Sequence, residues 1–458
     1  MNKLTPAELS EIVNPKIKPT PEQSKVISLD KDGVHLVLAG AGSGKTETMA
    51  GRAVWLTVND DISPERILGL TFTRKAAQEL TERFRQRIAQ VRANHKALRA
   101  AGYPLTWMPE GETDYGFASP TVSTYNSFAA SIFSEHAALI GWNSDSLVIT
   151  DATAYGIARG VVEKSNDERL AELDKAIDGI VPLVKKLADS LAEYGQVEND
   201  AVINFGIEFG KIAQRNPDKL KKFADVATLE ILVPLARDFI TEKRRLEVVE
   251  FSDQVVLARQ IINQNPEVGE LYRARFDAII LDEYQDTSYS QTSLFSELFG
   301  PARITAVGDP NQSIYGWRGA SPENVSGFFE AFGAPSEGNT HTLTESRRNG
   351  HQILKAANTL LEYRGEDEAH PRKVDTLVAN AEASDNPITA IYTEDNTGEA
   401  DALAKWFRKQ RETKVYDPVK KVEREQNLAM LIRSRTNLRT YLKAFDENEV
   451  PYLSLIHI

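Results

Sequence analysis

Several residue types and patterns are missing from this sequence of 458 residues, and each absence excludes a class of function. The chain has no cysteine, which excludes disulfides, thiolate zinc sites and a cysteine nucleophile. Its seven histidines are scattered, so we expect no transition-metal cluster. No apolar run approaches the length that spans a bilayer, and the first ten residues, MNKLTPAELS, lack a signal-peptide pattern. We therefore expect a cytoplasmic protein that does not associate with a membrane.

The chain also lacks an excess of positive charge. Its 54 lysines and arginines against 66 acidic residues give a formal net charge of −12. This balance argues against a protein that binds polyanions over its whole surface, but it leaves room for a local basic channel. With 41% hydrophobic and 26% charged residues the composition is that of a globular protein, and the length predicts two or three domains.

One glycine-rich segment is typical of a phosphate-binding loop. LAGAGSGKTET follows the apolar run VHLVL and places small residues ahead of Lys45 and Thr46. A buried strand that leads into glycines and then into a helix lets backbone N–H groups converge on an anion. In a Walker A motif Gly42 and Gly44 permit the turn, Lys45 reaches the β- and γ-phosphates, and Thr46 ligates Mg²⁺. Ala39 stands where that pattern has its first glycine, and the alternative is a glycine-rich turn with a solvated lysine.

Short apolar segments alternate with helical patterns on both sides of the middle of the chain. RILGLTFT (66–73), FDAIILDE (276–283) and ARITAVGD (302–309) each read as a buried strand that ends in polar residues. Such strands predict an α/β fold with a parallel sheet covered on both faces. Between them, residues 150–250 carry leucines and other apolar residues at helical spacing among many charges, which predicts a helical insertion. Two later segments, PITAIYTED and NLAMLIRSR, predict strands of a second strand-helix unit.

The acidic pair in AIILDEYQDTS follows one of these predicted strands. In a Walker B arrangement Asp282 holds Mg²⁺ through water, and Glu283 orients and deprotonates the attacking water. An acidic pair after a strand is also common as a merely solvated pair. Together with GSGKT it predicts nucleotide hydrolysis.

The segment AVGDPNQSIYGWRGA suggests a link between a nucleotide and a nucleic acid. Gln312 follows a strand at the same predicted edge as the phosphate loop, where it would contact a γ-phosphate. Tyr315, Trp317 and Arg318 come directly after it, and aromatic rings beside an arginine form a plausible platform for stacked bases. The alternative for Trp317 is a core anchor, but Gly316 beside it favours exposure.

These motifs, in this order, resemble those of superfamily 1A DNA helicases of the UvrD/Rep/PcrA type, from about Thr20 to Tyr452. TPEQSKVI resembles the segment in which Gln23 reads the adenine. TFTRKAAQEL resembles motif Ia, with Phe72 and Thr73 along single-stranded DNA.

Later segments extend the resemblance. STYNSF resembles the next DNA-contacting motif, where Thr124 and Ser127 match its hydroxyl positions. EFSDQVV resembles the segment where the insertion returns to the first motor domain. In LTESRRNGHQIL, which resembles motif IV, Arg348 falls where the family has an arginine finger. Arg347 stands where the family usually stacks a tyrosine on adenine, and Glu47 replaces an arginine common after the phosphate loop in Rep-like enzymes.

The resemblance implies two RecA-like domains, 1A and 2A, with a helical 1B insertion. The implied division is 1–149 and 251–335 for domain 1A, 150–250 for the insertion, and 336–452 for the start of domain 2A. It also implies an ATP-dependent DNA helicase or translocase, with ATP and Mg²⁺, that acts on single-stranded and duplex DNA in repair or recombination. GKTETMA and LGLTFTRKAA are more similar to the motor subunits of the actinobacterial AdnAB helicase-nuclease, which implies a second motor subunit in a heterodimer.

The candidate residues fall into four groups. The catalytic candidates are Lys45, Glu283, Gln312 and Arg348. The nucleotide-binding candidates are Gln23, Ala39, Gly40, Ala41, Gly42, Ser43, Gly44, Lys45, Thr46, Glu47 and Arg347. The DNA-binding candidates are Phe72, Thr73, Thr124, Ser127, Tyr315, Trp317 and Arg318. The candidate Mg²⁺ ligands, with the nucleotide, are Thr46 and Asp282.

The family's motifs V and VI do not occur in the sequence. We therefore expect an N-terminal fragment that is inactive in unwinding. The last residues, LSLIHI (453–458), can be encoded by the transposon end sequence used in sequencing libraries, which predicts a sequencing-adapter artefact after Tyr452; the alternative is a genuine β-strand. The rival function is a nucleotide-switched DNA- or protein-binding module without translocation, and RNA is a lesser alternative as the track.

Overall fold

The structure is a computed structural model of the 458-residue chain. It describes residues 3–108, 119–215, 221–321, 323–363, 375–417 and 422–453. Contacts divide the chain into two compact units, Met1–Ser384 and Asp385–Ile458. The predicted adapter artefact, apart from its first residue, lies outside the described residues. Within the described ranges no helix is long and apolar enough to cross a membrane.

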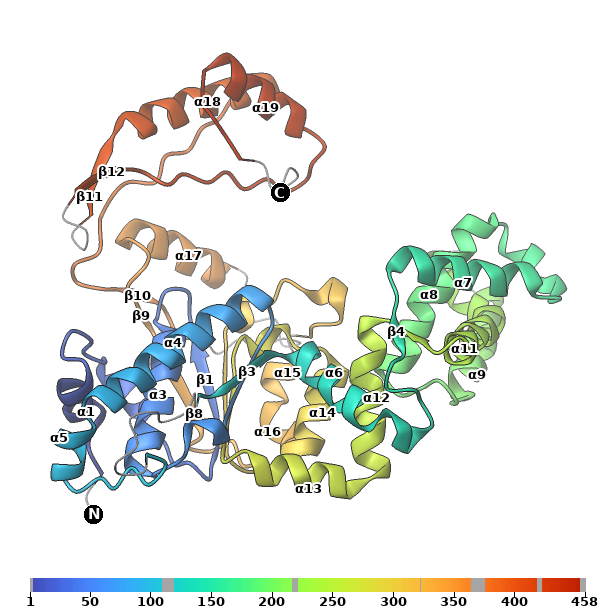
Figure 1. The fold of residues 1–458 in the computed structure, drawn as a ribbon. Coiled ribbons are helices and arrows are strands. Elements are labelled where there is room, and N and C mark those ends of the chain that lie inside the picture. Colours follow the sequence, from blue (N-terminus) through green and yellow to red (C-terminus); the bar gives the residue numbers. More distant parts are fainter. Residues whose placement is uncertain are drawn as a thin grey trace. The chain divides into compact units, whose positions relative to one another are not determined.

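A six-stranded parallel sheet organises the first unit, in the order β3-β2-β6-β7-β1-β8 (Figure 1). The strands are β1 (Val34–Ala39), β2 (Ile67–Thr71), β3 (Thr121–Thr124), β6 (Ala278–Leu281), β7 (Ile304–Gly308) and β8 (Thr340–Leu343). All residues of β1, β2, β6 and β7 are buried, as strands covered on both faces must be. The predicted parallel sheet is confirmed, and its carboxyl ends bring three separate motifs to one edge.

The alternation of side chains along β1 shows how the two faces are covered. Leu36 and Leu38 belong to one hydrophobic core, and Val37 and Ala39 belong to the other. The second core contains residues of α1 (Pro6–Val13), α2 (Pro21–Ile27), α3 (Lys45–Asn59), α4 (Arg74–Ala93) and α5 (His95–Ala100). The first core contains residues of α6 (Tyr125–His136), η2 (Ala137–Ile140), α12 (Phe251–Gln264), α13 (Pro266–Arg275), α14 (Tyr289–Phe299), α15 (Glu323–Ser326) and α16 (Phe328–Ala331).

The predicted helical insertion has a core of its own. Its elements are α7 (Asp151–Lys164), η3 (Glu168–Leu173), α8 (Ile177–Glu193), α9 (Ala201–Arg215), η4 (Lys221–Thr228) and α11 (Leu229–Arg245). At its base, β4 (Leu147–Val148) pairs in parallel with β5 (Val248–Val249). The apolar stripes of α8 and α11 are largely buried, with Val184 and Phe239 completely so. Leu183, one of the leucines at helical spacing in α8, is instead 37% exposed.

Beyond β8, the chain returns to the phosphate loop before it enters the second unit. β9 (Glu345–Ser346) pairs in parallel with β10 (Val378–Ala379), and α17 (His351–Tyr363) lies between them in sequence. The second unit contains α18 (Asn396–Glu412), the antiparallel pair β11 (Lys414–Asp417) and β12 (Val422–Glu425), and α19 (Leu438–Glu447). Its small core joins α18 to α19 through Phe407 and Phe445.

The two strands predicted at PITAIYTED (387–395) and NLAMLIRSR (427–435) are wrong. Neither segment is assigned to a strand, although both are described. Tyr392 and Leu431 are almost fully exposed, and Ile388 is 56% exposed. An apolar alternation gives a strand only where a neighbouring strand satisfies its backbone groups, and no segment of the described chain pairs with these two.

Candidate functional site

The loop after β1 has the backbone geometry of an anion site. Gly42 and Gly44 both have φ of +81°, which L side chains rarely adopt. A Cβ on Gly42 would lie 2.5 Å from Ser346 Oγ, so glycine is required there for space as well as for conformation. Ser43 donates a hydrogen bond to the carbonyl of Gly40 at 2.9 Å and holds the loop closed. The fifteen-residue α3 begins directly after this turn, so its free N–H groups and dipole face the same space.

The predicted first-glycine position, Ala39, needs no glycine. It is the last residue of β1, has no exposed surface, and precedes the turn. Its neighbours Gly40 and Ala41 carry the chain into the turn, and the carbonyl of Ala41 accepts a hydrogen bond from Ser346 at 2.9 Å. The loop is therefore fastened to β9 as well as to its own strand.

The acidic pair lies opposite Lys45. Lys45 Nζ is 3.1 Å from Glu283 Oε2, across 238 positions in sequence. Asp282 is only 5% exposed, and its Oδ1 accepts a hydrogen bond from the Glu283 backbone N–H at 3.0 Å. The Asp282 carbonyl accepts the hydroxyl of Tyr125 at 2.8 Å. Glu283 has φ of +49°, a strained conformation for a non-glycine residue and one that recurs at functional sites.

Electrostatics divide the two carboxyls into different roles. Burial, with Glu283 next to it, raises the pKa of Asp282 to about 6. Burial alone would also raise the pKa of the Glu283 carboxyl. Lys45 and the amide of Gln285 outweigh that effect, and the charge of Arg348 adds to theirs, so that its pKa lies below the ordinary value. Glu283 is therefore ionised at neutral pH, and Asp282 is a buried carboxyl whose charge would be favoured by a cation.

Gln285, which was not among the candidate residues, joins the acidic pair to the loop after the next strand, β7. It is 1% exposed; its Nε2 donates to Glu283 Oε2 at 2.8 Å, and its Oε1 accepts from the Asp309 backbone N–H at 3.0 Å. A Cβ on Gly308 would lie 2.8 Å from that Oε1. Gln312 donates to Asp309 Oδ2 at 2.7 Å, so the predicted phosphate sensor ends the same chain of contacts. The only signal in the sequence was a glutamine two residues after the pair.

Three aromatic rings form a row at this edge of the sheet. Phe72, at the end of β2, and Tyr315 have ring centroids 4.7 Å apart, and those of Tyr315 and Trp317 are 6.2 Å apart. Trp317 is 74% exposed, so the alternative in which it anchors the core is wrong. We call residues 315–320 the stacking loop; the backbone of Arg318 lies in it, within η7 (Gly316–Arg318), and its side chain is outside the described part.

The hydroxyl residues that were predicted to contact DNA lie at the starts of helices, and two of them are N-caps. Thr73 Oγ1 accepts the backbone N–H of Ala76 at 3.1 Å at the start of α4. Thr124 Oγ1 accepts the backbone N–H of Ser127 at 3.1 Å and donates to Ser127 Oγ at 2.8 Å. Thr124 is 9% exposed, whereas Ser127 is exposed. These threonines fix the first turns of helices that begin at the sheet edge.

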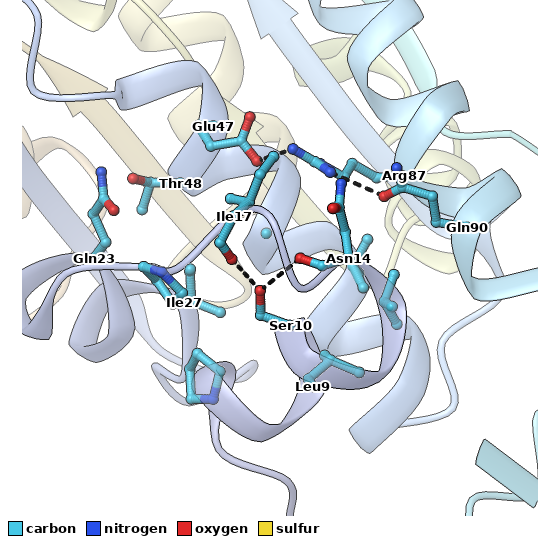
Figure 2. A pocket seen from close by; sticks show the side chains of 15 residues that line it. Leu9, Ser10, Asn14, Ile17, Gln23, Ile27, Glu47, Thr48, Arg87 and Gln90 are labelled. Atoms are coloured by element: carbon cyan, nitrogen blue, oxygen red, sulfur yellow. Dashed lines mark hydrogen bonds and ion pairs between the residues drawn. The ribbon is translucent and has the colours of Figure 1, made fainter. Parts of the chain in front are cut away.

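A small pocket lies beside the phosphate loop and is lined by residues of α1, α2, α3 and α4 (Figure 2). Gln23 contributes to its wall and donates from Nε2 to the Ser43 carbonyl at 3.0 Å. Glu47 lies on the same wall, but its carboxylate is paired with Arg83 at 2.7 Å and with Arg87 at 2.5 Å. The remaining lining is largely apolar, from residues such as Leu9, Val13, Ile17 and Val54. An apolar wall with a few polar groups is typical of the lining of ligand sites.

The two consecutive arginines after β9 reach the phosphate loop. The backbone N–H of Arg347 donates to the Gly42 carbonyl at 2.9 Å, and its guanidinium lies 3.6 Å from Glu345. A Cβ on Gly42 would lie 2.6 Å from Arg348 Cβ. Both arginines are exposed. Arg348 is thus next to the turn that would hold phosphate, and its charge acts on Glu283.

The oxygen ligands at this site suit a hard cation that binds together with phosphate groups. Among the described residues no group of three or more His, Cys, Asp or Glu side chains could hold a metal ion. Thr46 and Asp282 together supply one hydroxyl and one buried carboxylate. Mg²⁺ typically takes few protein ligands and completes its shell with water and substrate phosphates. The residues present therefore fit Mg²⁺ bound with a nucleotide.

Comparison with known proteins places this geometry in a family. Residues 19–333, well over half of the chain, match the family described as UvrD/REP helicase N-terminal domain. The chain is similar to the ATP-dependent DNA helicase PcrA of Staphylococcus aureus (strain Mu50), with 27% identity over 434 residues, 94% of this chain and 50% of that protein. It is also 27% identical over 435 residues to PcrA of Staphylococcus epidermidis (strain ATCC 12228), with the same two coverages. The chain spans about half the length of the curated relatives it matches.

Proposed function

Because this chain belongs to the UvrD/REP helicase family, we propose that it is the ATP-hydrolysing motor region of a DNA helicase that moves along single-stranded DNA. The observation that supports this most strongly is the continuous line of contacts along one sheet edge. It runs from Lys45 through Glu283 and Gln285 to Asp309, and the same loop continues into Trp317. A phosphate site and a stacking site joined in this way are what a DNA-dependent motor needs.

The proposed reaction is hydrolysis of ATP to ADP and phosphate. The loop backbone and Lys45 bind the phosphate chain, and the ionised Glu283 orients the attacking water and accepts its proton as the oxygen bonds to the γ-phosphorus. Gln312 contacts the γ-phosphate, and Arg348 meets the charge that develops on it. Thr46 and Asp282 would hold Mg²⁺, which neutralises charge on the phosphate oxygens when it is bound.

The proposed site for the adenine of ATP is the pocket of Figure 2, beside the phosphate loop. Gln23 contributes its amide to the adenine, and Arg347, whose backbone N–H is bonded to the Gly42 carbonyl, would stack on it. Glu47 acts there through its ion pairs with Arg83 and Arg87, which shape the wall, because both of its oxygens are occupied. Residues 39–44 supply the remaining backbone contacts.

The proposed DNA site is the row of Phe72, Tyr315 and Trp317, with Arg318 beside it. Stacking on aromatic rings tolerates any base, so this site suits single-stranded DNA without sequence preference. We also include Thr73, Thr124 and Ser127 in the proposed DNA site, because they lie at the starts of α4 and α6, where helix N-termini favour a phosphate. Duplex DNA would be the substrate for unwinding.

We also propose the domain division that the motifs imply, with domain 1A at 1–149 and 251–335, the insertion at 150–250, and domain 2A from 336. The separate core of the insertion supports its assignment. The proposed start of domain 2A precedes the contact boundary at Ser384, so this division counts β8, which pairs with β1 in the first sheet, with domain 2A.

A narrower proposal concerns the complex and the pathway in which this motor acts. The segments GKTETMA and LGLTFTRKAA support an affiliation with AdnAB-type motor subunits, a second motor subunit, a role in repair or recombination, and a cytoplasmic location. Co-purification of this protein, in its natural length, with a second motor subunit would test this affiliation. Recovery as a monomer that is fully active would contradict it.

The variant Glu283→Gln tests the proposed chemistry. It should bind ATP normally, because Lys45 and the loop are unchanged, but it should hydrolyse ATP about 10²–10⁴ times more slowly without its base. Glu267→Gln, an exposed carboxylate at the start of α13, is the matched control and should leave both properties unchanged. Hydrolysis at the normal rate in Glu283→Gln would show that another group is the base. A nucleotide-switched binding module, the rival function, would show no ATP turnover that depends on single-stranded DNA in the natural-length protein.

A further inference from the structure

A second pair of exposed aromatic rings lies next to the stacking loop and has no part in the function proposed above. Tyr194 directly follows α8 of the insertion, and Tyr289 is the first residue of α14 in the motor. Their ring centroids are 5.1 Å apart and their planes are inclined by 34°. Tyr194 is 53% exposed and Tyr289 41% exposed, although two large rings in contact would normally be covered by a core.

Contacts of the neighbouring residues hold this pair beside the stacking loop. Ser288 forms an antiparallel bridge with Ala320, the last residue of that loop. Ser290 donates from its backbone N–H and its hydroxyl to Glu193, at 2.8 Å each. A Cβ on Gly319 would lie 3.6 Å from Ser288 Cβ and 3.9 Å from Glu193 Oε1. The residues that flank Tyr194 and Tyr289 thus contact the loop that carries Trp317.

Of the two rings, Tyr194 has the more open surface. Tyr289 contacts Tyr194 and also has the guanidinium of Arg259 6.0 Å from its centroid. That guanidinium is held by Glu297, with Arg259 Nη2 2.6 Å from Glu297 Oε1. Tyr289 is therefore supported by a fixed cation, and Tyr194 is the more exposed of the two rings. A planar apolar group can stack on Tyr194 without displacing any of these contacts.

We propose that Tyr194 and Tyr289 form an auxiliary stacking site for single-stranded DNA, which takes nucleotides adjacent to those held by Trp317. The proposal rests on the proposed function, because continuity with the stacking loop identifies the occupant. A strand that leaves Trp317 toward the insertion meets Tyr194 next. Each base that stacks on an aromatic side chain typically strengthens binding by about 5- to 150-fold.

The test is the dependence of binding on oligonucleotide length. Fluorescence anisotropy measures the Kd of this chain for labelled oligo(dT) of two lengths, about 4 nucleotides to cover the stacking loop and about 10 to reach the insertion. Tyr194→Ala removes the outer ring, and Tyr194→Phe keeps it. Phe205→Ala is the matched control, because Phe205 is an aromatic residue of the same insertion with 60% exposure.

The proposal predicts that Tyr194→Ala weakens binding of the long oligonucleotide by at least about fivefold and leaves the short one unchanged. Tyr194→Phe and Phe205→Ala should bind both lengths as the unmodified chain does. The proposal would be overturned if Tyr194→Ala bound both the short and the long oligonucleotide as tightly as the unmodified chain does. Loss at both lengths would overturn it too, because the pair would then only fasten the insertion to the stacking loop. If Trp317→Ala also left binding of both lengths unchanged, the proposed DNA site itself would be wrong, which separates the two failures.

Discussion

The substitution Gln285→Met removes the amide that joins Glu283 to Asp309 while it keeps the volume of the side chain. Three hydrogen bonds are lost, of 2.8 Å to Glu283, 3.4 Å to Asp286 and 3.0 Å from Asp309. Glu283 retains Lys45 as a partner, but the backbone N–H of Asp309, in a residue only 4% exposed, loses its acceptor. An unsatisfied buried donor costs about 1–3 kcal/mol, so the free energy of unfolding should fall by that amount.

The effect on catalysis follows from the loss of the hydrogen bond between Gln285 and Glu283. Gln285 holds one oxygen of Glu283 in place, and a hydrogen bond to a charged group contributes about 1.5–3 kcal/mol. If the transition state uses that alignment, kcat should fall about 10- to 100-fold, while KM for ATP stays near its original value because the phosphate loop is intact. The loss of the amide also raises the pKa of Glu283, since Gln285 helps to lower it. The acidic limb of the kcat–pH profile should therefore move to higher pH.

Steady-state ATP hydrolysis across pH, with urea unfolding of the same samples, checks both effects. Gln291→Met is a suitable control, since it replaces another buried glutamine, at 7% exposure, whose partners are Ser288 and Asn126. If Gln285→Met lost stability but kept kcat and its pH profile, Gln285 would be a packing residue only. A rise in KM without a change in kcat would equally refute the reasoning.

Three further predictions concern other parts of the site. Trp317→Ala should weaken single-stranded DNA binding by about 1–3 kcal/mol and leave ATP hydrolysis without DNA unchanged, as measured by anisotropy and steady-state assays; an unfolded variant would mean that the ring has a structural role. Gly42→Ala should abolish ATP binding in a calorimetric titration, because the added Cβ would lie 2.5 Å from Ser346 Oγ and φ is +81°; ordinary affinity would show that the loop is not the phosphate site. Burial, with His35, Lys25 and Arg52 nearby, lowers the pKa of His341 to about 4 from an ordinary 6.5. Between these two pH values the unfolded chain therefore binds more protons than the folded chain. The free energy of unfolding should decrease by on the order of 3 kcal/mol as the pH falls from 6.5 to 4. In urea titrations across this pH range, His341→Gln should lose stability less steeply.

The sequence predicted those parts of the fold whose strands are buried on both faces. The strands that end at Ala39, Leu281 and Gly308 are continuous apolar runs followed by polar or glycine residues, and all three form in the sheet. The segments at 387–395 and 427–435 also carry several apolar residues, but they have no partner strand in the described chain, so a local pattern failed there. Burial by neighbours, which a local pattern does not encode, decides between the two outcomes.

The candidate site was predictable where a residue acts through its own chemistry. Lys45 and Glu283 meet as their motifs suggest, and Trp317 is exposed as its flanking glycine suggests. Gln285 was not predictable, because its role depends on a contact with the backbone of Asp309 across 24 positions in sequence. The pair of Tyr194 with Tyr289 joins the insertion to the motor over a still longer separation, and no local pattern marks it.

The contacts from Lys45 to the stacking loop predict that the nucleotide site and the DNA site are energetically coupled. The most direct test is the Kd of Glu283→Gln for oligo(dT), measured with and without saturating ATP, because this variant holds ATP without consuming it. Coupling through Glu283, Gln285 and the stacking loop predicts that ATP changes this Kd by about fivefold or more, and that the DNA changes the Kd for ATP by the same factor. Identical affinity for DNA with and without bound ATP would contradict the claim.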